Sequence, residues 1–209
     1  MNSIQKAYNS WASQYDTNQN KTRDLEGEAL QTILSTIDFE RVLEIGCGTG
    51  KNTVWLQKKA QYVTAVDFSD EMLGKARGKI TSDNVEFKQA DITKDWDFSG
   101  GEYDLVTFSL VLEHIQNLDY IFKEAANSLK VGGYVYVGEL HPFKQYTGSK
   151  ARFETETGLQ VLDCYTHNIS DFTQAAKQHG FIVADINEHF DNNDRTQIPR
   201  ILTILLQKV

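Results

Sequence analysis

Three glycines at alternate positions are the first residues in this chain whose spacing points to ligand chemistry. Gly46, Gly48 and Gly50 follow the apolar run 42–45 directly and lead into a helix candidate. Glycine permits positive φ and lets a ligand approach the backbone closely, and the N-terminus of the following helix presents free N–H groups. A tight strand-to-helix turn without a ligand would have the same glycines. The dinucleotide fingerprint G-x-G-x-x-G needs Gly or Ala at position 51, and Lys51 stands there, which disfavours a nicotinamide cofactor.

Acidic residues end the next two apolar runs along the chain. Asp67 closes Val63-Thr64-Ala65-Val66, and Asp91 follows the third run beside Ile92. A carboxylate at position 67, where the second strand ends, can accept hydrogen bonds from the hydroxyls of a ribose. Asp67 could instead cap the helix that begins nearby, but its pairing with the glycine loop favours the ribose interpretation. Asp91 could accept from an adenine amine, with Ile92 against the ring, or could be an ordinary loop acid.

Two histidines after later apolar runs are candidate general bases. His114 lies in Leu112-Glu113-His114-Ile115, and His141 precedes Pro142. An imidazole near its normal pKa accepts a proton around neutral pH, and ligands bind at the C-terminal edge of a parallel sheet. His114 could also be a polar residue in a first helical turn, and His141 a turn histidine. The five histidines show no metal-ligand spacing, so no metal is predicted.

An alternation of strands and helices would position these residues. The strands are predicted from short runs rich in β-branched and aromatic residues at 41–45, 62–66, 85–88, 103–108, 133–139, 181–189 and 201–207. Apolar residues at helical spacing predict a helix over 118–129, which Gly132-Gly133 would stop. Acidic residues at its start predict a helix over 70–79, and Ser170 as N-cap with Gly180 as stop predicts one over 170–179. This order is typical of an α/β fold, in which crossover helices cover a parallel sheet.

The two ends of the chain depart from this alternation. No helical pattern separates the last two strands, and Asp191-Asn192-Asn193-Asp194 favours a turn. The last of seven strands is therefore expected to be antiparallel in an otherwise mostly parallel sheet. Helical patterns at 4–13 and 23–37 predict an N-terminal helical cap. We expect one domain, 1–209, with a cap (1–40), a ligand-binding half (41–140), a lid segment (141–168) and a closing helix and hairpin (169–209).

Composition excludes several classes of protein. The 209 residues include 29 Asp+Glu against 21 Lys+Arg, and the resulting charge of −8 disfavours broad nucleic-acid binding. Cys47 and Cys164 are too few for a disulfide scaffold. No apolar stretch approaches the roughly 20 residues of a membrane span, and the polar N-terminus does not resemble a signal peptide. A cytoplasmic monomer or homodimer without membrane contact is the expectation.

Four blocks of the sequence resemble class I S-adenosylmethionine-dependent methyltransferases. The blocks are 42–50, 63–72, 89–92 and 103–115. Within this family the chain resembles most the branch that acts on small molecules, which includes the ubiquinone/menaquinone- and biotin-pathway enzymes. The run 129–135 fits the loop before strand five, and 7–16 resembles that branch's N-terminal cap. The match runs in order over about residues 7–140. It implies a three-layer Rossmann-like sheet, S-adenosyl-L-methionine as cofactor and a small-molecule acceptor.

The resemblance also implies a set of cofactor-binding residues. They are Tyr15, Glu44, Gly46, Cys47, Gly48, Gly50, Asp67, Phe68, Met72, Asp91, Ile92, Ser109 and Leu110. By this resemblance Glu44 and the glycines would hold the methionine end, with Cys47 filling space in their loop. Phe68 and Met72 would flank the adenine. Ser109 and Leu110 would lie near the sulfur, and Tyr15 would cover the cofactor.

On the substrate side the resemblance favours an active-site position for His114 and leaves His141 open. Methyl transfer from a sulfonium is an in-line displacement, which needs alignment and water exclusion and needs a base only when the acceptor must lose a proton. The stretch His141–Phe153 contains Lys144, Lys150 and Arg152 and no acid. It is either a solvated loop or a lid that meets an anionic acceptor. A non-catalytic protein that binds S-adenosylmethionine for regulation would carry the same cofactor motifs.

Overall fold

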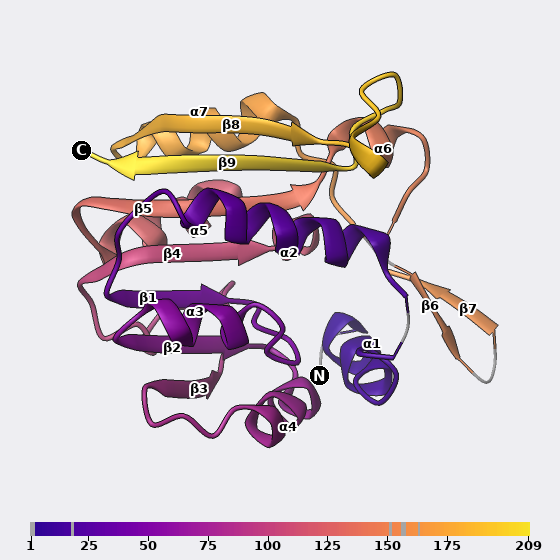
Figure 1. Cartoon of the computed structure of the whole chain (residues 1–209), viewed down its shortest axis with the longest axis horizontal. Helices are drawn as coiled ribbons and strands as arrows, with labels where there is room; N and C mark the ends of the chain where they lie inside the picture. Colours follow the sequence, from indigo (N-terminus) through magenta and orange to yellow (C-terminus); the bar gives the residue numbers. More distant parts are fainter. Residues whose placement is uncertain (1–2, 18, 151, 156–157, 163) are drawn as a thin grey trace.

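A seven-stranded mixed sheet forms the centre of the molecule (Figure 1). The computed structural model describes residues 3–17, 19–150, 152–155, 158–162 and 164–209. Within them the strand order is β3-β2-β1-β4-β5-β9-β8. The strands are β1 Arg41–Ile45, β2 Tyr62–Asp67, β3 Val85–Gln89, β4 Tyr103–Ser109, β5 Leu129–Leu140, β8 Phe181–His189 and β9 Ile201–Lys208. The first five run parallel, and β9 pairs antiparallel with both β5 and β8, which confirms the predicted fold class.

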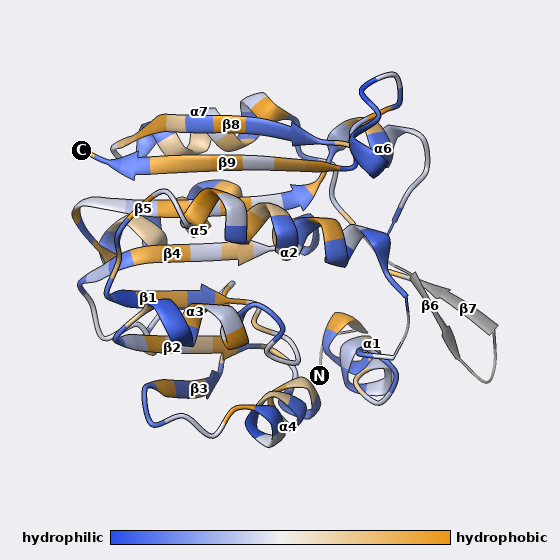
Figure 2. Ribbon diagram, viewed as in Figure 1, coloured by the Kyte–Doolittle hydropathy of each residue, from blue (hydrophilic) through white to orange (hydrophobic). Residues whose placement is uncertain are grey.

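Apolar side chains alternate between the two faces of the sheet and bury both. In β1, Val42 packs with the cluster under α2 (Lys21–Leu34), whereas Leu43 packs with the cluster under α5 (Leu118–Ser128) and α7 (Ile169–Gln178). Burial on both faces explains why these strands read as continuous apolar runs. Figure 2 shows the same apolar bands running through the central strands.

The two N-terminal helices have different environments. Leu30, Ile33 and Leu34 of α2 are spaced along one helix face and pack on the sheet beside Tyr136 and Leu205. The helix α2 therefore belongs to the layer that covers the sheet, together with α3 (Thr53–Lys59). The helix α1 (Ser3–Trp11) instead packs against α4 (Asp70–Lys79), at the carboxyl ends of the parallel strands.

Two helix boundaries differ from the sequence prediction. The helix predicted over 118–129 ends at Ser128, and β5 begins at once at Leu129, four residues earlier than expected. Gly132, predicted to stop the helix, lies inside this strand with φ +82°, where β4 and β5 shift register. The helix α7 is capped by Asn168 in a capping box with Asp171, so its N-cap lies two residues before the predicted Ser170.

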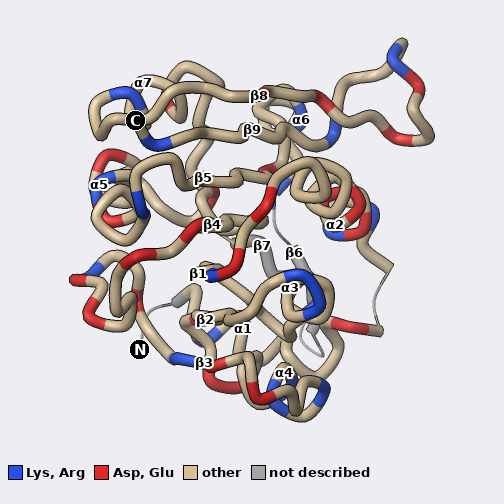
Figure 3. Tube along the Cα trace, turned by 60° about the vertical axis from the view of Figure 1, so that its left-hand side comes forward, with Lys and Arg blue, Asp and Glu red and all other residues tan. Residues whose placement is uncertain are grey.

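The segment 141–168 contains structure that the sequence patterns did not predict. A short helix, α6 (Pro142–Tyr146), follows β5, and β6 (Arg152–Thr155) pairs with β7 (Gly158–Val161) in a separate hairpin. Short 3-10 turns, η1 (Leu112–His114) and η2 (Asp191–Asn193), complete the elements. Among the described residues no helix has the length and apolar character to cross a bilayer. Figure 3 shows that the positions of Asp and Glu alternate with those of Lys and Arg along helices and loops of the chain trace.

Candidate active site

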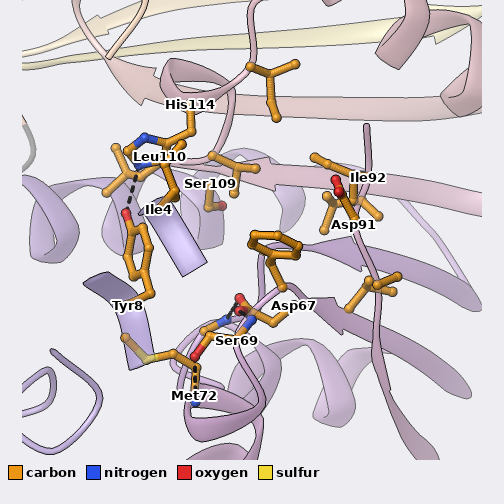
Figure 4. Close-up of a pocket in the computed structure, with 18 of the residues that line it drawn as sticks. Ile4, Tyr8, Asp67, Ser69, Met72, Asp91, Ile92, Ser109, Leu110 and His114 are labelled. Carbon is orange, nitrogen blue, oxygen red and sulfur yellow. Dashed lines mark hydrogen bonds between the residues drawn. The ribbon is translucent and has the colours of Figure 1, made fainter. Parts of the chain in front are cut away.

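A pocket opens where β1, β2 and β4 end, and α1 borders it on the side opposite the sheet (Figure 4). The carboxyl ends of parallel strands are where α/β sheets bind ligands. Eleven of the site residues predicted from the sequence line this pocket: Tyr15, Gly46, Gly48, Asp67, Phe68, Met72, Asp91, Ile92, Ser109, Leu110 and His114. The chain thus brings together residues from five separate segments at one edge of the sheet.

The glycine loop is fastened to the end of β2. The N–H groups of Gly46 and Cys47 donate to the Val66 carbonyl at 2.7 and 3.0 Å. Gly46 has φ +73°, and a Cβ there would lie 2.1 Å from Val111 Cγ2. Gly48 has φ +53°, and a Cβ there would meet nothing within 4 Å, because it would point into open space beside the pocket. Gly46 is thus required by packing, whereas Gly48 keeps the backbone open to a ligand.

The third glycine has a structural role. Gly50 has φ +81°, and a Cβ there would come within 2.9 Å of Ile80 Cδ1 at the end of α4. It therefore permits close packing of the glycine loop against that helix, and it does not line the pocket. Cys47 likewise lies outside the pocket lining, and its buried thiol has a pKa well above the ordinary value because burial disfavours the thiolate.

Asp67 is held at the pocket wall by two backbone donors. Its Oδ2 accepts from Gly48 N–H and its Oδ1 from Ser69 N–H, both at 2.8 Å. Burial raises the pKa of this carboxyl, and the two backbone hydrogen bonds partly oppose that shift. Ser69 is the residue that caps α4, because its Oγ accepts from Met72 N–H. The Asp67 carboxylate is thereby oriented without serving as the cap itself.

The wall beside Asp67 is apolar. Phe68, Ile92 and Met72 line it, and Met72 is almost fully buried against Trp11 and Ala7 of α1. Asp91 Oδ1 accepts from Thr93 N–H at 3.0 Å and from Thr93 Oγ1 at 2.6 Å. The arrangement offers a flat ring an apolar slot with one carboxylate at its rim.

The loop after β4 forms the opposite wall and is supported from behind by a buried acid. Leu110 has φ +57°, a left-handed conformation that is costly for a branched side chain. Its N–H donates to the Gly138 carbonyl at 2.8 Å. Glu139 Oε1 accepts from Val111 N–H at 2.9 Å and from Leu112 N–H at 2.8 Å. These bonds hold the strained backbone of the loop against the pocket.

Polar side chains attach α1 to the residues around the pocket. Gln5 Nε2 donates to the Phe68 carbonyl at 2.8 Å, and Ser69 Oγ donates to Asn9 Oδ1 at 2.5 Å. After the helix, Asp16 forms an ion pair with Lys79 at the end of α4. Thr49 Oγ1 donates to the same Asp16 carboxylate at 2.6 Å. The N-terminal segment is thus joined to the glycine loop and to α4.

Tyr8 is a pocket residue that the sequence reasoning missed. It extends from α1 to His114 of η1, and its hydroxyl lies 2.8 Å from His114 Nε2 (Figure 4). Burial raises the pKa of the Tyr8 phenol well above the ordinary value. A signal for it existed, because Tyr8, Trp11 and Tyr15 lie three, four and seven residues apart, the spacing of one helix face.

Glu44 and His141 lie outside the pocket lining. Glu44 accepts from Thr53 Oγ1 at 2.5 Å, and burial raises its pKa to about 8. His141 is fully buried and caps α6, since its Nδ1 accepts from Phe143 N–H at 3.2 Å while its Nε2 lies 3.0 Å from Glu188 Oε1. Burial lowers the pKa of this histidine. Its partners therefore give His141 a structural position.

The expected lid segment is only partly described. Lys144 lies on α6 and Lys150 is exposed after it, whereas the side chains of Arg152 and Phe153 lie outside the described residues. Residues after the hairpin run beside η1, where Tyr165 N–H donates to the Glu113 carbonyl at 2.7 Å. This stretch therefore contacts the 3-10 turn that carries His114. Among the described residues no cluster of His, Cys, Asp and Glu could hold a metal ion.

Known proteins resemble this chain in sequence and in fold. A methyltransferase domain model matches residues 43–137. An uncharacterized methyltransferase of Synechocystis is 30% identical over 155 residues, which are 69% of this chain and 68% of that protein. A ubiquinone biosynthesis O-methyltransferase of Dechloromonas aromatica is 29% identical over 141 residues, 66% of this chain and 60% of that protein. The alignment thus spans about three fifths of the quinone-pathway relative.

The fold is also found among solved structures. The structure of an S-adenosylmethionine-dependent methyltransferase from Listeria monocytogenes matches with a TM-score of 0.74 and 24% identity. That match covers 89% of this chain and 99% of the Listeria chain.

Proposed function

The chain belongs to the S-adenosylmethionine-dependent methyltransferases, and from this premise we propose that it transfers a methyl group to a small-molecule acceptor held at the His114 side of the pocket. The observation that carries the proposal is the Asp67 carboxylate, fixed between the Gly48 and Ser69 N–H groups at the wall of a pocket with an open glycine backbone. A carboxylate so placed suits the two hydroxyls of a ribose.

The residues present fit S-adenosylmethionine. Gly48 leaves space where any side chain would project, Asp67 supplies the acceptor for ribose hydroxyls, and the apolar slot of Phe68, Ile92 and Met72 suits an adenine. When bound, the cofactor supplies an activated methyl group on a sulfonium. The protein's task is then to orient the acceptor in line with that group and to exclude water.

Each remaining group in the proposed machinery has a separate task. Ser109 and Leu110 would border the reacting centre with a rigid backbone, because Leu110 N–H donates to the Gly138 carbonyl and Glu139 accepts from the next two N–H groups. Tyr15 would cover the cofactor from the N-terminal segment. His114 would accept a proton from acceptors that must lose one. His141, with both ring nitrogens engaged elsewhere, has no place in this scheme.

The proposed class of acceptor rests on the names of the relatives. The O-methyltransferase of ubiquinone biosynthesis acts in a small-molecule pathway by its name. An anionic acceptor would be favoured by Lys150, an exposed cation in the segment predicted to be a lid. Lys150→Ala should then raise KM for carboxylate-bearing acceptors and leave KM for neutral ones unchanged.

A screen of small-molecule acceptors that reads out S-adenosylhomocysteine tests the proposed function. Turnover with at least one acceptor, reduced strongly in Asp67→Ala at subsaturating cofactor, is expected. Tight binding of S-adenosylmethionine without turnover on any acceptor would instead favour a regulatory protein that only binds the cofactor.

A further inference from the structure

Tyr8 and His114 form a hydrogen-bonded pair inside the pocket, although 106 positions separate them in the chain. Both side chains line the pocket, and Figure 4 shows the Tyr8 hydroxyl directed at the imidazole of His114. The ring of Tyr8 meets the imidazole edge-on, with centroids 5.5 Å apart, and packs against Trp11 at 5.8 Å. The hydroxyl is therefore held in one place by contacts on two sides of the ring.

We propose that the Tyr8 hydroxyl is a catalytic proton carrier, which takes the proton of a hydroxyl-bearing acceptor while passing its own proton to His114 Nε2. The inference rests on the proposed function and extends it to a substrate class, namely acceptors methylated on an ionisable hydroxyl oxygen, such as phenols and enols. It also gives His114 the tautomer with its proton on Nδ1, because Nε2 must accept from Tyr8.

The surroundings of Tyr8 explain why the tyrosine cannot act alone. Burial raises the pKa of the phenol well above its ordinary value, and the acidic groups of Tyr15, Glu113, Asp67 and Cys164 raise it further. These groups come from the segment after α1, from η1, from β2 and from the segment after β7. A phenolate would be unfavourable among them, so Tyr8 stays protonated and needs a partner that takes its proton.

His114 is that partner, and Glu113 supports it. The Glu113 Oε1 lies 3.9 Å from His114 Nε2, close enough to stabilise an imidazolium. Burial raises the pKa of Glu113 to about 7, so the carboxyl becomes ionised near neutral pH. Glu113 is a positioning and electrostatic residue here, since it does not line the pocket.

The step balances in protons and electrons. The O–H bond of the acceptor breaks and its proton joins Tyr8 oxygen, while the Tyr8 O–H bond breaks and that proton joins His114 Nε2. The electron pair left on the acceptor oxygen forms the new bond to the methyl carbon. The pair of the S–CH₃ bond stays on sulfur, which leaves neutral S-adenosylhomocysteine. His114 then releases its proton to solvent.

Tyr8→Phe tests the proposal because it removes the hydroxyl and keeps the ring packing. Tyr120→Phe is the matched control. Tyr120 lies on α5, and the substitution removes one exposed hydroxyl, which donates to Asp95. Acid–base groups contribute about 10²–10⁴ in rate. We expect Tyr8→Phe to lower kcat with catechol by at least about tenfold, with little change in the affinity for S-adenosylmethionine measured by calorimetry. Tyr120→Phe should match the wild type.

A second acceptor separates proton transfer from simple structural damage. With 4-nitrocatechol, which is far more ionised than catechol at neutral pH, the loss in Tyr8→Phe should shrink markedly. An equal loss with both acceptors would overturn the relay. A wild type that turns over only amine or thiol acceptors would overturn the substrate class. A wild type that binds no S-adenosylmethionine would refute the proposed function itself, which is a distinguishable result.

The tautomer provides a readout that does not depend on activity. In ¹⁵N spectra of histidine-labelled protein, with His114→Gln used for assignment, His114 Nε2 should be an unprotonated acceptor in the wild type. Its resonance should shift in Tyr8→Phe and stay unchanged in Tyr120→Phe. A proton found on Nε2 in the wild type would contradict the proposed direction of transfer.

Discussion

At the scale of single residues, the glycine loop divides two tasks between neighbours two positions apart. Both Gly46 and Gly48 have positive φ, but only Gly46 faces a side chain where its Cβ would be, that of Val111. Gly48 faces the pocket and also donates its N–H to Asp67. The sequence indicates all three glycines of the loop equally, and only the packing shows which of them lines the pocket with open space where its Cβ would be.

Exchanging each glycine for alanine should separate these tasks. Gly46→Ala should lower the free energy of unfolding by roughly 2–4 kcal/mol, since left-handed backbone strain of about 1–2 kcal/mol adds to overpacking against Val111. In Gly48→Ala the free energy of unfolding should fall only by the cost of left-handed backbone strain, about 1–2 kcal/mol. The affinity of this variant for S-adenosylmethionine should nevertheless fall at least about tenfold, roughly 1.4 kcal/mol. Chemical denaturation and calorimetry measure the two quantities, and equal stability losses with unchanged affinity for Gly48→Ala would contradict this division.

At the scale of elements, the short helix α6 begins at a side chain that sequence reasoning offered as a base. His141 caps this helix through Nδ1 and reaches Glu188 of β8 through Nε2. A histidine before a proline could have been either a catalytic or a turn residue from sequence alone. The choice depends on Glu188, which lies 47 positions away and which no local pattern connects to His141.

Removal of this cap should change stability and leave catalysis intact. His141→Ala should lower the free energy of unfolding by about 1 kcal/mol, the usual effect of losing an N-cap. His141→Asn should recover part of that loss, since asparagine also accepts from a backbone N–H. We expect kcat for both variants within about twofold of the wild type. A hundredfold fall in kcat at unchanged stability would return His141 to the catalytic machinery.

Some helices and strands were predictable from the sequence, and others were not. The strands β1, β2, β4 and β9 were predictable because burial on both faces leaves apolar runs bounded by polar turns. The start of β5 was not, since Leu129–Gly133 resembles a helix end with glycines, and only pairing with β4 makes it a strand. The helix α6 was missed because five residues are too few for a periodic pattern.

At the scale of the whole molecule, four glutamates among the described residues are buried around the sheet's carboxyl edge. Burial raises the pKa of Glu26 and Glu113 to about 7 and that of Glu44 and Glu139 to about 8. Glu26 lies on α2 and accepts from Tyr136 and Asn52, so the four come from different segments. A search by sequence finds the acids but not their burial, which depends on tertiary packing. The pairing of Tyr8 with His114 was unpredictable for the same reason.

These carboxyls should make the folded protein less stable as the pH rises from 6.5 to 8. The folded chain retains protons that the unfolded chain, with ordinary glutamate pKa values, has already released. Each such carboxyl contributes up to about 1.4 kcal/mol per pH unit. The pKa values of His141 and His189 are lowered by burial, which makes stability rise with pH. That rise ends at the ordinary histidine pKa near 6.5, so these histidines do not oppose the fall between pH 6.5 and 8.

Urea denaturation at several pH values measures this dependence. The free energy of unfolding should fall between pH 6.5 and 8, and Glu44→Gln should reduce the slope because glutamine does not titrate. A free energy that stays constant or rises across this range would contradict the burial of ionisable acids at the sheet edge.

The central claim is that Asp67 and the glycine loop bind S-adenosylmethionine at the edge of the sheet. Calorimetric titration of the cofactor into the wild type and into Asp67→Ala tests it most directly, with circular dichroism to check that the variant folds. The wild type should bind one equivalent, and Asp67→Ala should bind at least about tenfold more weakly, because hydrogen bonds to a charged group contribute about 1.5–3 kcal/mol. Absence of binding to the wild type, or an affinity unchanged in Asp67→Ala, would contradict the claim.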